Sequence, residues 1–313
     1  MVAPDLVLLG PQRLQPIVRQ TIRELGLPGE RVAIVTAGWE EREGEDQELR
    51  AHLATDTVNL RLHERIEAVF RERPDVFRAM EQRFDRLRAM RDVYRRRLDH
   101  ALEAARELLR LPDADPFLEE ERAAAIHAVH ELDEHHLERT RVFQRAFEAE
   151  HRVDEIPELC RERDEVDALL EGATALCIAG GHVGMLLNRL RLFGIARWFG
   201  RLPVLAWSAG AMALSDRIVL FHDSPPQGRV NAEVLEAGLG ACNDVVPLPH
   251  AKRRLLLDDP VRVGLFARRF PGKLCAALDE GSRLDRTEAG WQGAPGTRRL
   301  DASGSLEEVG RWS

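Results

Sequence analysis

The sequence predicts an α/β fold, a doubly wound and mostly parallel sheet, interrupted by an inserted arm of long helices. Short apolar runs alternate with segments of helical periodicity at both ends of the chain, which is typical of a parallel sheet covered by helices. All 23 glycines of the 313 residues lie outside residues 45–171. Because tight turns and close backbone contacts need glycine, this charge-dense segment is expected to form long helices. We therefore assign residues 1–63 and 166–313 to an α/β domain and residues 64–165 to the arm.

The first part of the α/β domain has three expected strands and two expected helices. Apolar and β-branched runs predict strands at residues 5–9, 31–36 and 57–62. Helical spacing of apolar residues predicts helices at 14–25 and 47–54. Trp39 follows the second strand, at the strand end where open α/β sheets bind ligands, so we expect it on the substrate side of a site.

After the arm the same alternation resumes. A helix is expected to end before Gly172, and the next strand, at 173–179, is closed by Gly180-Gly181. Residues 183–198 are amphipathic, and a further strand at 202–206 runs directly into Ser208. This order of strands and helices favours a parallel sheet.

The arm is expected to be a helical hairpin. Apolar residues recur at helical intervals over 66–109 and 117–147, and two prolines, Pro112 and Pro116, mark the turn between them. Residues 78–110 hold ten arginines against six acids, whereas residues 111–165 hold seven against seventeen. Opposite charges suit mutual pairing of the two halves, and a net charge of −7 over residues 64–165 disfavours nucleic acid as a partner. The arm could cap a site or mediate a homodimer.

Composition excludes several classes of protein. No apolar run approaches the roughly 18 residues that a membrane span needs, and no basic segment precedes an apolar stretch at the N-terminus. The four cysteines are scattered without CxxC spacing, which predicts neither a zinc site nor disulfides. We expect a cytoplasmic protein that binds no membrane.

The sharpest chemical feature is the run Val204-Leu-Ala-Trp-Ser208-Ala-Gly-Ala211. A buried strand that breaks into small residues and then a helix is the pattern of a nucleophile elbow, which would expose the Ser208 hydroxyl above the sheet. The N–H of Ala209, at the helix start, would help stabilise an oxyanion. Taken by itself, this motif is explained about equally well by a helix that begins after a strand, with small residues that pack on the strand and have no catalytic role.

A serine nucleophile needs a base and an acid, and the sequence offers both downstream. Asp223 and His250 follow Ser208 by 15 and 42 residues. The order resembles the α/β-hydrolases, but their acid comes from a much later strand. A glutamine amidotransferase would have cysteine at 208 and an acid where Lys252 stands. Both of these alternatives fit less well.

Taken together, these segments resemble the dipeptidase E and cyanophycinase family of serine peptidases. Ala-Trp-Ser208-Ala-Gly-Ala is similar to the Gly-Trp-Ser-Ala-Gly-Ala elbow of that family, and Ile178-Ala-Gly-Gly181 is similar to its Gly-Gly-Asn segment. Further matches are Leu220-Phe-His-Asp223, Leu248-Pro-His250 and Ala277-Leu-Asp-Glu280. The resemblance covers residues 5–62 loosely and 165–285 well.

The resemblance implies a flavodoxin-like sheet of the class I glutamine amidotransferase type with a serine peptidase site. Ser208 would be the nucleophile, His250 the base, and Asp223 or Glu280 the acid. The N–H groups of Gly181 and Ala209 would bind the oxyanion. Residues placed on the substrate side are Gly180, His182 and Trp207, with Trp39. The substrates would be short peptides with Asp-X or β-aspartyl bonds, cleaved without a metal or organic cofactor.

The chain departs from the family on the substrate side. His182 replaces the family's asparagine, Ala251 its aromatic residue and Ala206 its first elbow glycine. The alternative function is therefore a non-catalytic scaffold that uses the arm for protein–protein interaction. Histidines and glutamates at 127–136 have i,i+4 spacing, but a solvated helix face explains them better than a metal site.

Overall fold

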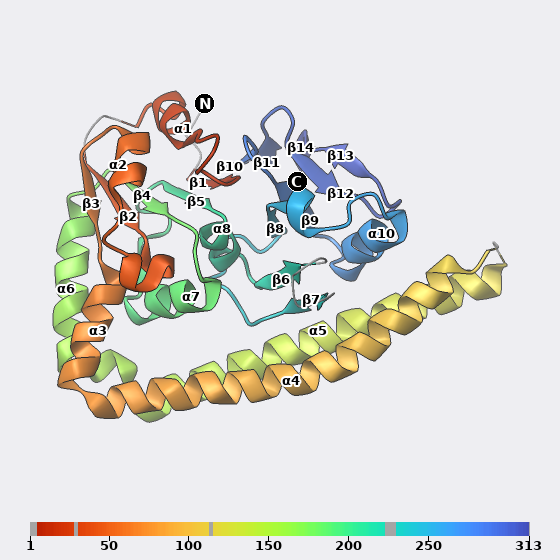
Figure 1. Ribbon diagram of the computed structural model, residues 1–313, viewed down its shortest axis with the longest axis horizontal. Helices are drawn as coiled ribbons and strands as arrows, with labels where there is room; N and C mark the ends of the chain where they lie inside the picture. Colours follow the sequence, from red (N-terminus) through yellow and green to blue (C-terminus); the bar gives the residue numbers. More distant parts are fainter. Residues whose placement is uncertain (1–4, 28–30, 113–114, 223–229, 313) are drawn as a thin grey trace.

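The computed structural model describes residues 5–27, 31–112, 115–222 and 230–312, which form a mixed α/β molecule with long helices (Figure 1). The strands are β1 (Leu6–Leu9), β2 (Val32–Val35), β3 (Thr57–Asn59), β4 (Ala175–Ile178), β5 (Val204–Trp207), β6 (Val219–His222), β7 (Val230–Val234), β8 (Val245–Pro249), β9 (Leu274–Leu278), β10 (Arg283–Thr287), β11 (Gly290–Gly293), β12 (Arg298–Leu300), β13 (Leu306–Glu308) and β14 (Arg311–Trp312). The α-helices are α1 (Val18–Glu24), α2 (Gln47–Leu53), α3 (Leu62–Glu72), α4 (Pro74–Arg110), α5 (Pro116–His151), α6 (Pro157–Glu171), α7 (Val183–Leu192), α8 (Ala209–Leu214), α9 (Ala251–Arg254) and α10 (Pro260–Arg269). Short 3-10 turns are η1 (Ala37–Arg42), η2 (Val153–Glu155) and η3 (Ile195–Trp198).

The largest sheet has eight strands in the order β14-β11-β10-β1-β5-β4-β2-β3. The pairs from β1 to β3 are parallel, and β10, β11 and β14 extend the sheet in antiparallel fashion. Side chains of the parallel strands alternate between two cores: Val7 and Leu9 of β1 face α1 and α2, whereas Leu6 and Leu8 face the opposite core. Both faces are therefore covered, as expected for near-continuous Val, Ile and Leu strands.

A second sheet lies beside the first. Its order is β13-β12-β9-β8, and β8 and β9 are parallel with Val245 opposite Leu274. The hairpin of β6 and β7 stands apart from both sheets, between the α/β part and the arm (Figure 1). The carboxyl ends of β5 and β8 carry Ser208 and His250.

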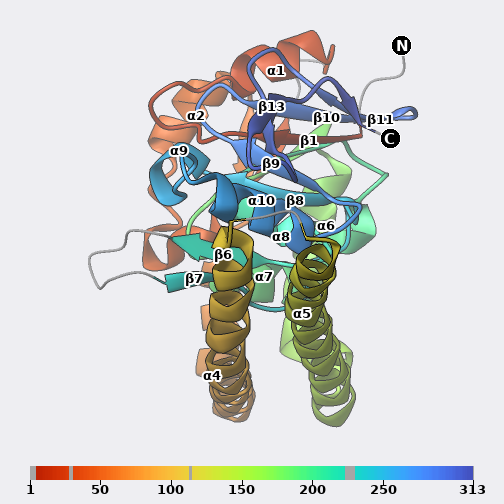
Figure 2. The same cartoon turned by 90° about the vertical axis from the view of Figure 1, so that its right-hand side faces the viewer.

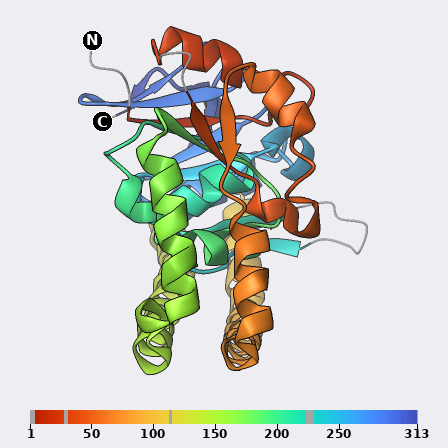
Figure 3. The same ribbon diagram turned by 90° about the vertical axis from the view of Figure 1, so that its left-hand side faces the viewer.

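The inserted segment forms a hairpin of two long helices, α4 and α5. They contact each other and lie side by side below the α/β part in Figure 2, whereas Figure 3 shows the opposite side of the molecule, with α3 (orange) and α6 (green) in front. The expected ends of the arm, residues 64 and 165, fall inside α3 and α6, which continue the arm into the α/β part. The arm does not project freely, because α4 and α5 also contact α10 and β7.

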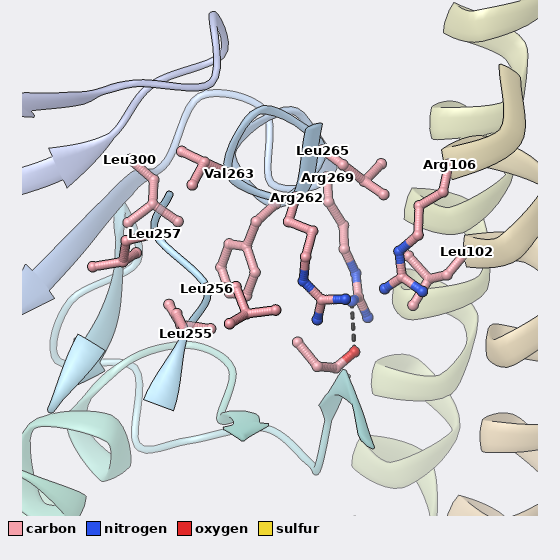
Figure 4. Close-up of a pocket in the computed structure, with 12 residues that line it drawn as sticks. Leu102, Arg106, Leu255, Leu256, Leu257, Arg262, Val263, Leu265, Arg269 and Leu300 are labelled. Atoms are coloured by element: carbon pink, nitrogen blue, oxygen red, sulfur yellow. Dashed lines mark hydrogen bonds between the residues drawn. The ribbon is translucent and has the colours of Figure 1, made fainter. Parts of the chain in front are cut away.

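A buried polar network ties the arm to the rest of the molecule. Asp133 of α5 is fully buried and accepts hydrogen bonds from Arg269 of α10 at 2.5 and 2.7 Å, and from the Tyr94 hydroxyl at 2.6 Å. The Tyr94 oxygen in turn accepts from the Val234 N–H of β7. Figure 4 shows Arg269 at a small, mostly apolar cavity between α10 and α4, where it also donates to the Ala232 carbonyl.

The arginines of α4 do not follow the expected pairing between the halves of the hairpin. Arg83 pairs with Glu236 at 3.3 Å and Arg95 with Glu233 at 3.1 Å, and both acids belong to the segment that begins with β7. Both acids are buried, so these two arginines of α4 form ion pairs with the α/β part and not with α5.

Two features of composition have counterparts in the structure. Cys160, Cys177, Cys242 and Cys275 are all free thiols, and the last three are buried. Among the residues that the structure describes, none of the helices has both the length and the apolar character that a membrane crossing requires.

Candidate active site

Ser208 occupies a strained turn between β5 and α8. Its φ of 52° and ψ of −123° lie in a region that residues other than glycine rarely adopt. β5 lies between β1 and β4, so the turn rises from the middle of the sheet. The Ser208 side chain makes no capping hydrogen bond to α8, and its oxygen is therefore available at the end of the strand.

Two glycine segments make room for this turn. A Cβ on Gly180 would lie 2.7 Å from the Ser208 Cβ, and one on Gly210 would lie 2.4 Å from the Ile178 carbonyl oxygen. Gly181 has a φ of 120°, and a Cβ there would lie 2.2 Å from the Gly38 oxygen. The backbone of residues 180–181 is thus held between Gly38 and Ser208, where no side chain would fit.

The expected oxyanion donors lie beside the serine. Gly181 follows Gly180, which touches Ser208, and the adjacent His182 N–H is fixed by a 2.7 Å bond to the Gly38 carbonyl. Ala209 is the first residue of α8, whose first N–H groups lack intrahelical partners. Neither the Gly181 nor the Ala209 N–H bonds to another described residue. Both N–H groups therefore stay candidates for the oxyanion donors.

His250 follows β8 in a left-handed conformation, with a φ of 58° and a ψ of 36°. Its N–H donates to the Leu278 carbonyl of the neighbouring β9, and its half-buried ring lines the same cavity as Ser208. Burial lowers the pKa of the His250 ring, and the nearby Arg254 guanidinium lowers it further. The ring is therefore neutral at neutral pH, as a general base must be.

Two carboxylates, Asp279 and Glu280, follow β9 next to His250. Both raise the pKa of His250, Asp279 more strongly, against the larger effect of burial. Asp279 is buried, and its Oδ1 accepts the Lys252 N–H at 2.9 Å, whereas Glu280 is exposed. The expected acid Asp223 lies outside the described residues.

Asp279 is a candidate for the orienting acid that the sequence analysis passed over. The sequence places it beside Glu280, and the signal that could have identified it is its position directly after the last residue of a buried strand. A strand parallel to the one that carries the base delivers its following residue to the same edge of the sheet.

Ser208 and His250 share a cavity of about 600 Å³. The expected substrate-side residues Gly180, Trp39 and Trp207 also line it. His182 is not among the lining residues. It is exposed and caps α7 instead, with Nδ1 accepting the Met185 N–H at 3.1 Å.

Arg254 is a second residue that sequence reasoning missed. It lies one helical turn after His250, is half-buried and lines the cavity. Among the described residues it has no carboxylate partner, and burial lowers its pKa. A partly desolvated guanidinium without a counter-ion favours an anionic group of a ligand.

Two histidines of α5, His130 and His136, make structural contacts. His130 hydrogen-bonds to the Arg269 carbonyl and His136 to the Leu235 carbonyl, each at 3.2 Å, and the His136 ring stacks on Tyr94. Within the described residues, no group of three His, Cys, Asp or Glu side chains is placed to hold a metal ion.

Comparison with known proteins does not identify the chain. No protein-family model matches it, and no curated protein sequence matches it either. Assignment of a function therefore rests on the geometry of the site.

Proposed function

We propose that this chain is a serine hydrolase that cleaves a peptide or amide bond in short peptides of the Asp-X or β-aspartyl type. The observation that carries the proposal is the strained Ser208, uncapped and facing the same cavity as the neutral His250. Strain in a non-glycine residue persists where function requires it, and nucleophile elbows are such a place. We further propose that the sheet belongs to the flavodoxin-like, class I glutamine amidotransferase type.

The reaction would proceed through an acyl-enzyme. His250 takes the proton of Ser208 as its Oγ attacks the carbonyl carbon, and the N–H groups of Gly181 and Ala209 hold the developing oxyanion. His250 then gives the proton to the leaving nitrogen, and the C–N bond breaks. A water molecule, deprotonated by His250, hydrolyses the ester and releases the carboxylic acid and Ser208.

The orienting acid in this scheme is Asp279 or Glu280, with Asp223 as the third candidate. Asp279 is favoured among the two described residues, because it is buried and acts more strongly on His250. A buried carboxylate that holds its own hydrogen bond can fix the imidazole without reorganising.

The volume and the lining of the cavity suit a short acidic substrate. A volume of about 600 Å³ is in the range of small-molecule sites and suits a dipeptide. Arg254 would pair with a carboxylate of the substrate, and bonds between charged partners contribute about 1.5–3 kcal/mol.

A dipeptide screen tests this function. The wild type should release amino acids from Asp-X or β-aspartyl dipeptides, whereas Ser208→Ala should not. Arg254→Met should lower kcat/KM for acidic dipeptides by about tenfold or more and change neutral ones little. The control Ser303→Ala alters an exposed serine in a turn and should keep full activity. No hydrolysis by a folded wild type across the screen would instead favour the non-catalytic scaffold.

A further inference from the structure

Three arginines from three helices meet at a cavity remote from Ser208. Arg83 of α4, Arg163 of α6 and Arg191 of α7 line a space of about 190 Å³ between the arm and the α/β part. Gln144 and Glu148 of α5 line the same space. None of these residues lines the cavity that contains Ser208.

The arginines that line this cavity are more deeply buried than the two acids that line it, Glu148 and Asp154. The side chains of Arg83, Arg163 and Arg191 are 1%, 12% and 16% exposed. Glu236, at 9% exposed, is shared by two of them, Arg83 and Arg191. Arg163 pairs with Asp154, whose side chain is 88% exposed and therefore screened by water.

Arg83 has unused hydrogen-bonding capacity. Its Nε donates to Gln144 Oε1 at 2.6 Å and its Nη2 to Glu236 at 3.3 Å, but its Nη1 is buried and has no acceptor in the described part of the chain. A buried guanidinium nitrogen that lacks an acceptor is costly, because its hydration is not replaced. Glu148 does not fill this role, since it is exposed and accepts from Gln144 instead.

Electrostatics at Arg83 agree with this geometry. Burial lowers the pKa of the Arg83 guanidinium, and the nearby Arg191 charge lowers it further, while Glu236 and Glu148 act in the opposite direction. Three guanidinium groups therefore line this space, and Glu236, the one deeply buried carboxylate that pairs with two of them, is not among its lining residues.

We propose that this cavity binds a small oxyanion, a phosphate or carboxylate group, held by Arg83 with Arg163 and Arg191. Arginine forks match the paired oxygens of both groups, and bonds between charged partners are the stronger kind. The volume admits one such ion. Because Arg83 belongs to the arm and Arg191 to the α/β part, the bound ion joins the two and stabilises their contact.

Thermal unfolding with inorganic phosphate tests the site. Millimolar phosphate should raise the unfolding midpoint of the wild type by about 2 °C or more, compared with sodium chloride of equal ionic strength. The increase should be lost in Arg83→Met, which keeps the apolar stem and removes the charge. It should persist in Arg96→Met, a change of an exposed arginine on the same helix. Acetate in place of phosphate distinguishes a carboxylate site from a phosphate site.

Titration calorimetry of the wild type with inorganic phosphate provides the second measurement, with about one ion bound per chain expected. An equal rise with sodium chloride, no binding of phosphate or acetate, or a rise that persists in Arg83→Met would each overturn the proposal. If Arg83→Met does not fold, Arg163→Met takes its place, with the same expected loss and the same contradicting result. These outcomes are independent of peptide hydrolysis, because no residue of the Ser208 cavity is altered.

Discussion

At the residue scale, the backbone of Ser208 is the most informative feature. A φ of 52° with a ψ of −123° is a conformation that glycine adopts freely and serine does not. The run of small residues after Trp207 predicted a tight turn here. It could not predict that Gly180 would pack against the turn and Gly38 against Gly180 and Gly181, because these glycines follow other strands of the sheet, β4 and β2.

We expect Ser208→Gly to be more stable than Ser208→Ala. Both variants lack the hydroxyl, but only glycine relieves the strain at this position, which amounts to about 1–3 kcal/mol. The difference should appear as an unfolding midpoint a few degrees higher for the glycine variant in calorimetry. A glycine variant that is less stable than the alanine variant would show that the turn is unstrained.

The second residue-scale prediction concerns the acid limb of the pH profile, which is the fall of kcat/KM at low pH. His250 must be neutral to accept the Ser208 proton, and burial with Arg254 lowers its pKa below the ordinary value of about 6.5. Activity should therefore fall only as the pH drops through a value below 6.5. Arg254→Met removes a charge that lowers this pKa, so the limb should move to higher pH. Lys252→Met is the control, since its side chain is not among the main groups that shift the pKa of His250.

An unchanged limb in Arg254→Met would mean that another group titrates in this pH range. The candidate is an acid of the triad, and Asp279→Asn and Glu280→Gln then separate the two. Substitution of the acid that orients the imidazole should lower kcat by orders of magnitude, and substitution of the other acid should not.

At the element scale, the arm combines what the sequence could predict with what it could not. Helical periodicity and the absence of glycine predicted two long helices with a proline-marked turn, and α4 and α5 confirm them. The charge pattern suggested that the halves pair with each other, which Arg83 and Arg95 contradict. Their partners lie more than a hundred residues away along the chain, and no local pattern reveals such contacts.

The buried Asp133 should matter more than any surface ion pair of the arm. Asp133→Asn leaves Arg269 buried with a weakened partner, which should lower the free energy of unfolding by about 3 kcal/mol. The matched control is Glu138→Gln on the same helix, whose partner Arg145 is exposed, and it should change stability by less than about 1 kcal/mol. Urea unfolding of both variants provides the comparison. Equal losses would argue against a special role for the network.

At the scale of the whole molecule, the arm and the α/β part form one packed unit. All five tryptophans lie outside residues 45–171, so tryptophan fluorescence reports on the α/β part alone. Circular dichroism at the helical band reports strongly on α4 and α5, which are the two longest helices of the described chain. The molecule thus carries separate probes of its two parts.

We expect both probes to give the same urea midpoint, because Arg269, Asp133 and Tyr94 join α10 to both helices of the arm. Unfolding of the arm alone would leave Arg269 of α10 without its buried partner Asp133, so the two parts should unfold together. Separate midpoints, with the helical signal lost first, would show that the arm is an independent unit. If this network couples the arm to the α/β part, the two urea midpoints should differ in the Asp133→Asn variant.

The central claim, that Ser208 is an activated nucleophile, is tested most directly by labelling the protein with a fluorophosphonate and measuring its intact mass. The wild type should gain one adduct located by peptide mapping at Ser208, and His250→Ala should label far more slowly, because the base that takes the Ser208 proton is gone. Ser208→Ala should gain none, and Ser303→Ala should label like the wild type. A folded wild type that gains no adduct, or a Ser208→Ala protein that labels as fast, would contradict the account.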